Sequence, residues 1–349
     1  MLFGKKGVVG LDIGSNAIKL VELKESRSGF ELKSLGEAIL PPEAIVNKVI
    51  INSSAVVEAI SSLAEELRIG TKNVVTSISG HSVIIKKITL PRASEEELEE
   101  SIQWELEQYI PHNISDINYD FQILPGEATE GNMDVLLVAA KKDITNDYTT
   151  VITEAGLNPV ILDVDVFALE NMYEVNYQIG FDEVVALVDI GASVTNINVL
   201  RGGISVSARD ISVGGKQFTE WIQKELDLNY DNAEKMKLSM GSGEAPAELD
   251  RVARDFTDLV CGEIQKTLDF FTATSYSGPI QKMVLGGGSS KVLHISSVLT
   301  DRMRIPVEIV NPFRNIRYDQ DKFDSEYILD IAPKAAVATG LAMRRLGDK

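Results

Sequence analysis

The chain contains two copies of one short sequence, and this duplication restricts its fold more than any other feature. The first copy is "VVGLDIGSNAIKLVEL" at residues 8–23, and the second is "VVALVDIGASVTNINVLRGG" at residues 184–203. Each copy predicts an apolar strand ending near an aspartate, a small-residue turn, a second strand, a glycine turn and a third strand. Solenoid repeats recur every ~20–50 residues. A duplication at this much longer spacing therefore predicts two similar subdomains.

The turns of both copies have the composition of an anion-binding site. Glycine and small residues let backbone N–H groups converge on one point, so two facing turns would hold a triphosphate from opposite sides. A phosphate-bound Mg²⁺ keeps several waters and takes one or two protein carboxylates, which suits Asp12 and Asp189. Lys19 on the second strand would offer a point charge to a phosphate. Its counterpart in the second copy is Asn196, so the two sites are not equivalent.

A third glycine-rich turn follows late in the chain, in "KMVLGGGSSKVLHISSVL". An apolar strand reaches Gly286, Gly287 and Gly288, and we expect a helix to begin near Ser289 and Ser290. A strand, glycine turn and helix in this order let the backbone approach a ligand closely and direct a helix N-terminus at its phosphates. The sequence contains neither a G-x-x-x-x-G-K-[ST] P-loop nor a G-x-G-x-x-G fingerprint.

Composition excludes other classes of function. The 349 residues suggest two domains of ordinary size, since single cores stop growing at about 250–300 residues. A formal net charge of −18 disfavours nucleic acid and anionic lipid as direct partners. The single cysteine, Cys261, fits a reducing compartment and a core position on a helix. The apolar runs are too short to cross a bilayer, and no secretory signal precedes Asp12, so we expect a cytoplasmic protein.

The region from about residue 71 to residue 156 has a different character, with strand-like segments around an acidic helix. In "SEEELEESIQWELEQYIP", Ser94 and Glu97 have capping-box spacing and Pro111 ends the helix. Seven glutamates between Glu95 and Glu107 face no lysine or arginine within the helix. Two interpretations remain open for them: a solvated acidic face, or a docking surface for a basic segment.

In their order, the three turns resemble the phosphate-1, phosphate-2 and adenosine motifs of the actin, DnaK-type chaperone and sugar-kinase superfamily. "ISVGGKQFTEWI", which contains Gly214 and Gly215, resembles the segment that follows the second hairpin in FtsA and in DnaK-type chaperones. Glu234 and Lys237 have the Glu-x-x-Lys spacing that meets adenosine in those chaperones, although exposed helix charge is the alternative. "DVDVFALE" and "APKAAVATGLAM" resemble the two connecting motifs, with Asp165 where related ATPases often carry Glu.

Over its whole length the chain most resembles the PilM family, FtsA-like proteins of type IV pilus assembly, because of its inserted region and its length. The resemblance implies an α/β, actin-like ATPase fold with two duplicated ribonuclease-H-like domains and an FtsA-type subdomain inserted in the first. The expected first domain (1A) covers residues 1–70 and 157–180, and the inserted subdomain (1C) covers 71–156. The second domain (2A/2B) covers 181–330, and a C-terminal helix at 331–349 returns to the first domain.

The resemblance also implies a cleft that binds ATP and Mg²⁺. The expected metal ligands are Asp12 and Asp189, and Asp165 is the candidate catalytic residue. Hydrolysis is expected to be weak or absent, because Asp is shorter than Glu and would place the attacking water poorly. The expected nucleotide-binding residues are Gly14, Ser15, Asn16, Lys19, Gly191, Ala192, Ser193, Gly214, Gly215, Glu234, Lys237, Gly287, Gly288 and Ser289.

The partner implied by the resemblance is a PilN-like inner-membrane protein, held by its short cytoplasmic N-terminal peptide, with other pilus assembly components as further partners. We place the peptide groove in residues 82–110. The protein would then be peripheral to the inner membrane through that partner. An FtsA-like cell-division protein is one alternative, but FtsA proteins typically append an amphipathic membrane helix, and this sequence stops at "LAMRRLGDK". A small-molecule kinase of the superfamily is the other, although no sugar-binding pattern stands out.

Overall fold

The duplication appears in the structure as two five-stranded sheets with the same topology. The computed structural model describes residues 7–124, 131–240, 247–275 and 277–348, and forms two compact units, residues 81–150 and the remainder. In the larger unit, one sheet has the order β10-β6-β1-β2-β3 and the other β15-β14-β11-β12-β13. In each, a three-stranded antiparallel meander is followed by two parallel strands. The predicted fold class, an α/β protein with two duplicated domains, is confirmed.

The strands of the first sheet are β1 (Val9–Ile13), β2 (Ala17–Ser26), β3 (Gly29–Ile39), β6 (Asn73–Ile78) and β10 (Asn158–Val164). Those of the second sheet are β11 (Val184–Ile190), β12 (Thr195–Arg201), β13 (Ile204–Ile211), β14 (Lys282–Gly286) and β15 (Val307–Ile309). The strand β6 falls inside the range 71–156 expected for the inserted subdomain, yet it pairs in parallel with both β1 and β10. The compact smaller unit begins after it, at residue 81.

Two helices join the sheets through a shared core. They are α4 (Asp165–Asn176) and α10 (Ala336–Ala342), and their apolar side chains pack together with residues of both sheets. The crossings are tight: a Cβ on Gly340 would lie 1.7 Å from the carbonyl oxygen of Ala168, and a Cβ on Gly10 would lie 2.0 Å from that of Ala338. The small residues of the second connecting motif are therefore required by close approach of backbones.

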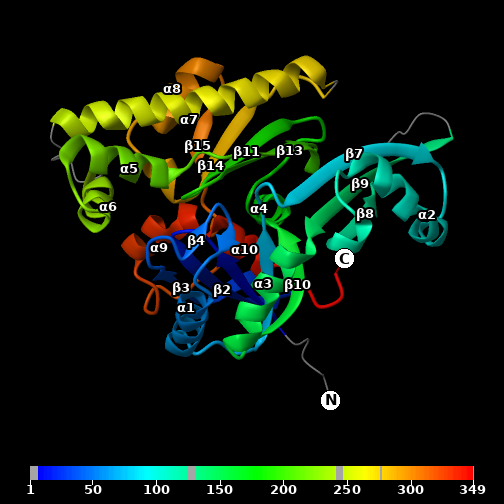
Figure 1. Cartoon of the computed structure of the whole chain (residues 1–349), viewed down its shortest axis with the longest axis horizontal. Coiled ribbons are helices and arrows are strands. Elements are labelled where there is room, and N and C mark those ends of the chain that lie inside the picture. The colour runs from blue at the N-terminus through cyan, green and yellow to red at the C-terminus, as the bar shows by residue number, and fades with distance from the viewer. Residues whose placement is uncertain (1–6, 125–130, 241–246, 276, 349) are drawn as a thin grey trace. The chain divides into compact units, whose positions relative to one another are not determined.

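The remaining helices of the larger unit cover the sheets. Helix α1 packs on β2 and β3 of the first sheet, and α7 packs beside α5 and α8 on the second (Figure 1). These helices are α1 (Ser53–Glu66), α5 (Gly215–Leu226), α6 (Tyr230–Ser239), α7 (Ala247–Thr274), α8 (Ile295–Met303) and α9 (Ser325–Ile331). Cys261 lies on α7 with no exposed surface, as expected of a core position. Burial raises the pKa of its thiol to about 12.

The smaller unit has a three-stranded antiparallel sheet with a helix packed on it. The sheet order is β7-β9-β8, formed by β7 (Val83–Pro91), β8 (Ile117–Ile123) and β9 (Asn132–Lys141). Helix α2 (Glu95–Tyr109) begins with the predicted capping box of Ser94 and Glu97, and buries Leu98, Ile102 and Leu106 in the core of the unit. Helix α3 (Lys142–Glu154) follows β9 directly.

One predicted helix start is wrong. No α-helix begins at Ser289: the residues after the glycine turn form a 3₁₀ helix (Gly288–Lys291), and α8 starts only at Ile295. The amides of Ser290 and Val292 donate to carbonyl oxygens three residues back. His294 then adopts a left-handed conformation with φ of 70°, which ends the first turn before α8 begins.

Candidate functional site

The two duplicated hairpins have the same local geometry at their turns. The amide of Gly14 donates to the carbonyl oxygen of Ala17 at 3.1 Å, and the amide of Gly191 donates to that of Val194 at 3.0 Å. In each turn an added Cβ would lie 2.8 Å from that same oxygen. The cross-strand register is also shared, since Asp12 faces Lys19 and Asp189 faces Asn196. The glycine after each Asp-Ile pair is therefore a steric requirement of the turn.

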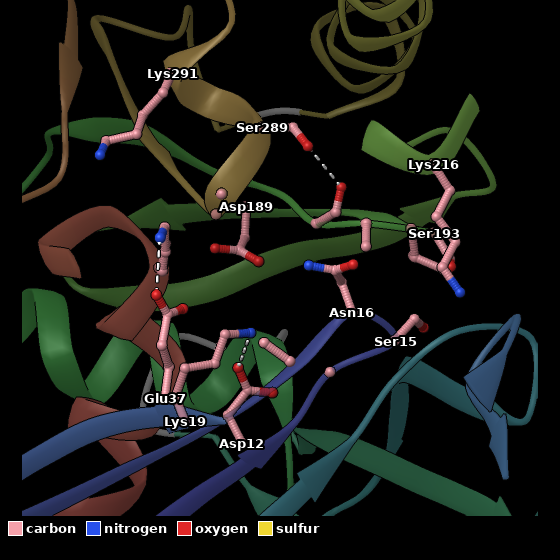
Figure 2. Close-up of a pocket in the computed structure, with 18 of the residues that line it drawn as sticks. Asp12, Ser15, Asn16, Lys19, Glu37, Asp189, Ser193, Lys216, Ser289 and Lys291 are labelled. Atoms are coloured by element: carbon pink, nitrogen blue, oxygen red, sulfur yellow. Dashed lines mark hydrogen bonds and ion pairs between the residues drawn. The ribbon is translucent and has the colours of Figure 1, made fainter. Parts of the chain in front are cut away.

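Both turns open into one cleft of about 540 Å³. Figure 2 shows Asp12 and Lys19 on one wall and Asp189 and Ser289 on the opposite wall, with Asn16 between them. The predicted residues that line the cleft are Asp12, Gly14, Ser15, Asn16, Lys19, Asp165, Asp189, Gly191, Ala192, Ser193, Glu234, Lys237, Gly287, Gly288 and Ser289. Segments far apart in the sequence thus contribute to a single concave site.

Gly214 and Gly215 are not among the residues that line the cleft. They pack behind the second turn, where the amide of Gly215 donates to the carbonyl oxygen of Gly191 at 2.9 Å. A Cβ on Gly214 would lie 2.6 Å from the carbonyl oxygen of Ala192, and one on Gly215 would lie 2.3 Å from Ser289 Oγ. In the structure the two glycines support the second turn and the third from behind.

Charge is concentrated at the end of the cleft where β1 and β11 finish. Lys19 Nζ lies 3.0 Å from Asp12 Oδ2. Burial, together with the negative charge of Asp12, raises the pKa of Asp189 to about 7, and Lys19 opposes the rise. The buried carboxylate of Asp189 is therefore destabilised by the charge of Asp12, and a bound cation would reduce this repulsion.

The residues of the cleft fit a Mg²⁺–nucleotide. Ser15 Oγ is buried and has no hydrogen-bond partner among the described residues, so its hydroxyl is available to a ligand at the first turn. Gly287 has φ of 81°, and a Cβ there would lie 2.3 Å from the carbonyl oxygen of Ile190, so only glycine fits at this position of the third turn. In the described part of the chain, no group of three or more His, Cys, Asp or Glu side chains forms a protein-only metal site. A pair of carboxylates is sufficient for Mg²⁺ that also binds phosphates.

Glu234 and Lys237 also line the cleft. Lys237 Nζ lies 2.7 Å from Glu234 Oε2 and 3.2 Å from the carbonyl oxygen of Gly215. Thr219 Oγ1 lies 2.6 Å from Glu234 Oε2. Burial lowers the pKa of Lys237, and the charge of Glu234 opposes that shift. The pair is therefore part of the cleft wall, in contrast to the alternative of exposed helix charge.

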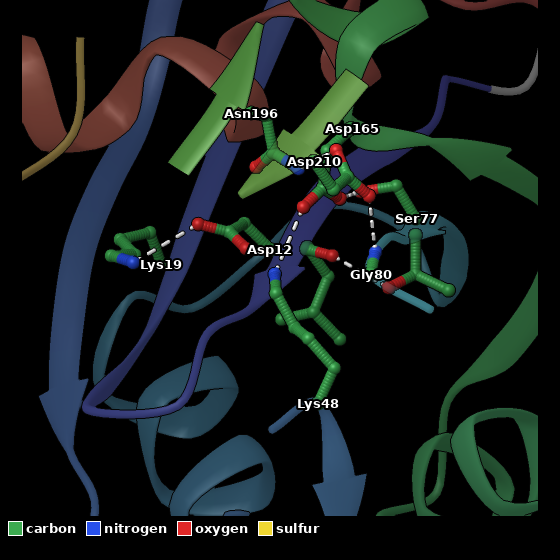
Figure 3. Close-up of polar contacts among 10 residues, drawn as sticks. Asp12, Lys19, Lys48, Ser77, Gly80, Asp165, Asn196 and Asp210 are labelled. Carbon is green, nitrogen blue, oxygen red and sulfur yellow. Dashed lines mark hydrogen bonds and ion pairs between the residues drawn. The ribbon is translucent and has the colours of Figure 1, made fainter. Parts of the chain in front are cut away.

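Asp165, the candidate catalytic residue, is buried at the first turn of α4 and is already engaged. Its Oδ2 lies 2.9 Å from Lys48 Nζ, and its Oδ1 accepts a hydrogen bond from Ser77 Oγ at 2.6 Å (Figure 3). Burial opposes ionisation of Asp165, but the charge of Lys48 and the hydrogen bond from Ser77 outweigh it and lower the pKa. Nearby, Asp210 Oδ1 accepts from Asn196 Nδ2 at 2.7 Å and Asp210 Oδ2 accepts from the amide of Gly80.

Sequence reasoning missed six of the twelve charged side chains that line the cleft. They are Glu37, Lys48, Lys216, Lys291, Asp330 and Lys334. Two had a signal in the sequence, because Lys216 directly follows Gly215 and Lys291 follows the Gly-Ser-Ser run of the third turn. Lys334 lies in the second connecting motif, and its Nζ is 3.0 Å from Glu37 Oε1.

Comparison with known proteins places the chain in a family. The family model described as type IV pilus assembly protein PilM matches residues 10–346. A solved structure titled "PilM-PilN type IV pilus biogenesis complex" is 31% identical, covers 99% of this chain and 100% of its own, and superposes with a TM-score of 0.86.

More distant structures share the fold. The ethanolamine utilization protein EutJ from Carboxydothermus hydrogenoformans is 15% identical, with a TM-score of 0.57 over 96% of this chain and 88% of its own. MreB5 of Spiroplasma citri bound to ADP is 13% identical, with a TM-score of 0.52 over 96% of this chain and 94% of its own. Among the described residues, no helix has the length and apolar character needed to cross a membrane. By the extent of the family match and the identity to a solved member, the chain belongs to the PilM family of type IV pilus assembly proteins.

Proposed function

We propose that this chain is an ATP-binding component of type IV pilus assembly that holds the cytoplasmic N-terminal tail of a PilN-like inner-membrane protein. The observation that supports nucleotide binding is the pair of matching hairpin turns on facing walls of one cleft. The first of these turns leaves the buried Ser15 Oγ without a partner, and Asp12 and Asp189 lie beside the two turns. The family match supports the pilus role over cell division and over small-molecule phosphorylation.

In this proposal the turns bind phosphates through backbone N–H groups and the Ser15 hydroxyl, and Lys19 contributes a point charge. Asp12 and Asp189 would hold Mg²⁺, which when bound neutralises phosphate charge. Glu234 and Lys237 would face the nucleoside end of the cleft. Hydrolysis would be weak or absent, because Asp165 is shorter than the Glu of related ATPases and one of its carboxylate oxygens already accepts a hydrogen bond from Ser77, whereas a general base needs an acceptor oriented on water.

The partner assignment is supported by the solved complex of a relative, whose title names PilM and PilN. We place the groove for the PilN-like peptide in residues 82–110 of the smaller unit, as the sequence suggested. Attachment through this peptide would hold the protein at the cytoplasmic face of the inner membrane, and further pilus assembly components would join the same complex.

Isothermal titration calorimetry with Mg-ATP tests the nucleotide site. Asp189→Ala removes one of the two carboxylates proposed to hold Mg²⁺, so we expect at least a tenfold loss of ATP affinity. We also expect that adding EDTA changes the affinity less in this variant than in the natural protein. Asp255→Ala is the matched control, because Asp255 is an exposed acid on α7 outside the cleft. Unchanged affinity in Asp189→Ala would reject the metal site.

A pull-down with a synthetic peptide of the PilN-like N-terminus, with and without Mg-ATP, tests the partner. Capture of this chain by the native peptide but not by a scrambled one is the expected result. Equal capture by both peptides would reject a specific groove.

A further inference from the structure

A two-strand hairpin that the sequence analysis did not predict carries a lysine into the nucleotide cleft. Strands β4 (Ile45–Val46) and β5 (Val49–Ile50) are joined by Asn47 and Lys48, with φ of 49° and 67°. Two left-handed residues in succession make the kind of two-residue turn in which asparagine and glycine are favoured. Lysine is less common than glycine at the second position of such a turn, and here its side chain lines the cleft.

The Lys48 side chain reaches the region where the metal ligands lie. Only 15% of it is exposed, it lines the cleft, and its Nζ lies 2.9 Å from Asp165 Oδ2 (Figure 3). Asp12 and Asp189, the proposed metal ligands, line the same cleft. Lys48 therefore lies in the same cleft as both carboxylates.

The same hairpin is also held by the second domain. Lys216, at the start of α5, donates from Nζ to the carbonyl oxygen of Ile45 at 3.0 Å. Through Lys48 and Ile45 the hairpin is therefore linked to α4 and to α5, and both lysines line the cleft. The strands themselves are two residues long: Ile45 is fully buried, whereas Val46 and Val49 are about 40% exposed.

We propose that Lys48 discriminates between nucleoside triphosphates and diphosphates: it pairs with Asp165 when the terminal phosphate position is empty and binds the terminal phosphate when it is occupied. This inference rests on the proposed nucleotide binding. A triphosphate brings added negative charge beside three carboxylates, those of Asp12, Asp165 and Asp189, so an ammonium group already in this region moves toward the stronger anion. Lys48 is the second residue of the β4–β5 turn, so a change of its partner should be detectable in this hairpin.

Four variants separate the amine from the turn. Lys48→Gly removes the amine and suits the left-handed backbone, and Lys48→Arg keeps a positive charge at the same place. Arg68→Gly is the matched control, since Arg68 is exposed, left-handed with φ of 48°, and outside the cleft. Lys48→Gly leaves the buried Asp165 without its cation, which destabilises the protein. The double variant Lys48→Gly/Asp165→Asn removes both charges, so the loss of the amine can be tested even if the single variant does not fold.

Calorimetric titration of each variant with Mg-ATP and with Mg-ADP is the test, together with amide hydrogen exchange over residues 45–51. We expect Lys48→Gly to lose at least tenfold in ATP affinity and no more than twofold in ADP affinity, and Lys48→Arg to recover part of the loss. ATP, but not ADP, should change exchange in the hairpin of the natural protein and of Arg68→Gly. Equal losses for both nucleotides, or no loss, would overturn the role of Lys48 while leaving nucleotide binding intact. Absence of binding by the natural protein would instead reject the proposed function and this inference with it.

Discussion

Glu170 on α4 provides a test of the electrostatics around the core between the two sheets. Its carboxyl group is partly buried, and the nearby polar groups of Asn198 and Ser205 favour its ionised form. Burial nevertheless dominates and raises the pKa of Glu170 from 4.5 to about 7. The folded protein therefore retains a proton there that the unfolded chain releases, and Glu170→Gln should remove a pH-dependent penalty.

The magnitude follows from the pKa difference. Well below pH 4.5, Glu170 is protonated in both the folded and the unfolded state, so it has no effect on the free energy of unfolding. As the pH rises from 4.5 toward 7, the unfolded state binds fewer protons than the folded state, so the protein becomes less stable. Well above pH 7, both states are ionised and the loss of stability is constant. At 1.36 kcal/mol for each pKa unit, the penalty is about 1.4 kcal/mol at pH 5.5 and about 3.4 kcal/mol at pH 8.5. The advantage of Glu170→Gln over the natural protein should therefore grow by about 2 kcal/mol between these pH values.

Urea unfolding followed by circular dichroism measures this difference, with the free energy extrapolated linearly to water. The range from pH 5.5 to 8.5 avoids the isoelectric point near 4.7. Glu174→Gln is the matched control, because Glu174 is an exposed glutamate on the same helix and surface substitutions usually change stability by less than about 0.5 kcal/mol. A difference between Glu170→Gln and the natural protein that stays flat across this range would refute the reasoning.

Two further substitutions test packing and the phosphate turn. Gly340→Ala places a Cβ 1.7 Å from the carbonyl oxygen of Ala168, so α10 must move away from α4. We expect a loss of stability of about 3 kcal/mol or more, measured as a lower midpoint of thermal unfolding. Gly7→Ala is the control and should not change the midpoint, because a Cβ at Gly7 meets nothing within 4 Å. Ser15→Ala removes a buried hydroxyl that has no partner in the described part of the chain, so stability to urea should hold or rise while calorimetric ATP affinity falls about fivefold or more. A loss of stability with unchanged affinity would assign Ser15 to the core.

The duplicated sheets were predictable because their signal is local and occurs twice. An apolar run, an aspartate and a glycine turn specify a hairpin with Asp12 opposite Lys19, and the same pattern specifies Asp189 opposite Asn196. Turn glycines such as Gly14 and Gly191 are identified by sequence alone because the steric constraint acts within four residues. Agreement between two copies removes the ambiguity of either one.

The residues that were missed depend on contacts between distant segments. Lys48 and Asp165 are 117 positions apart, and nothing near Lys48 indicates an acidic partner. The hairpin itself has strands of two residues, too short for a periodicity to be recognised. Its only local signal is Asn47 between two short β-branched runs, a pattern typical of a tight turn that does not show where the lysine points.

Gly214 and Gly215 show why a sequence does not distinguish residues that line a site from residues that support it. A glycine that contacts a ligand and a glycine that lies behind the site cannot be distinguished in a sequence, because at both positions there is no room for a Cβ. In the structure the excluded atoms at Gly214 belong to Ala192 and those at Gly215 to Ser289, which are the residues that line the cleft. A methyl group at either position would push the second or third turn toward the space where phosphates are proposed to bind. These two glycines would therefore control nucleotide affinity through the position of the cleft wall, and the distinction between lining and supporting residues can be drawn only from coordinates.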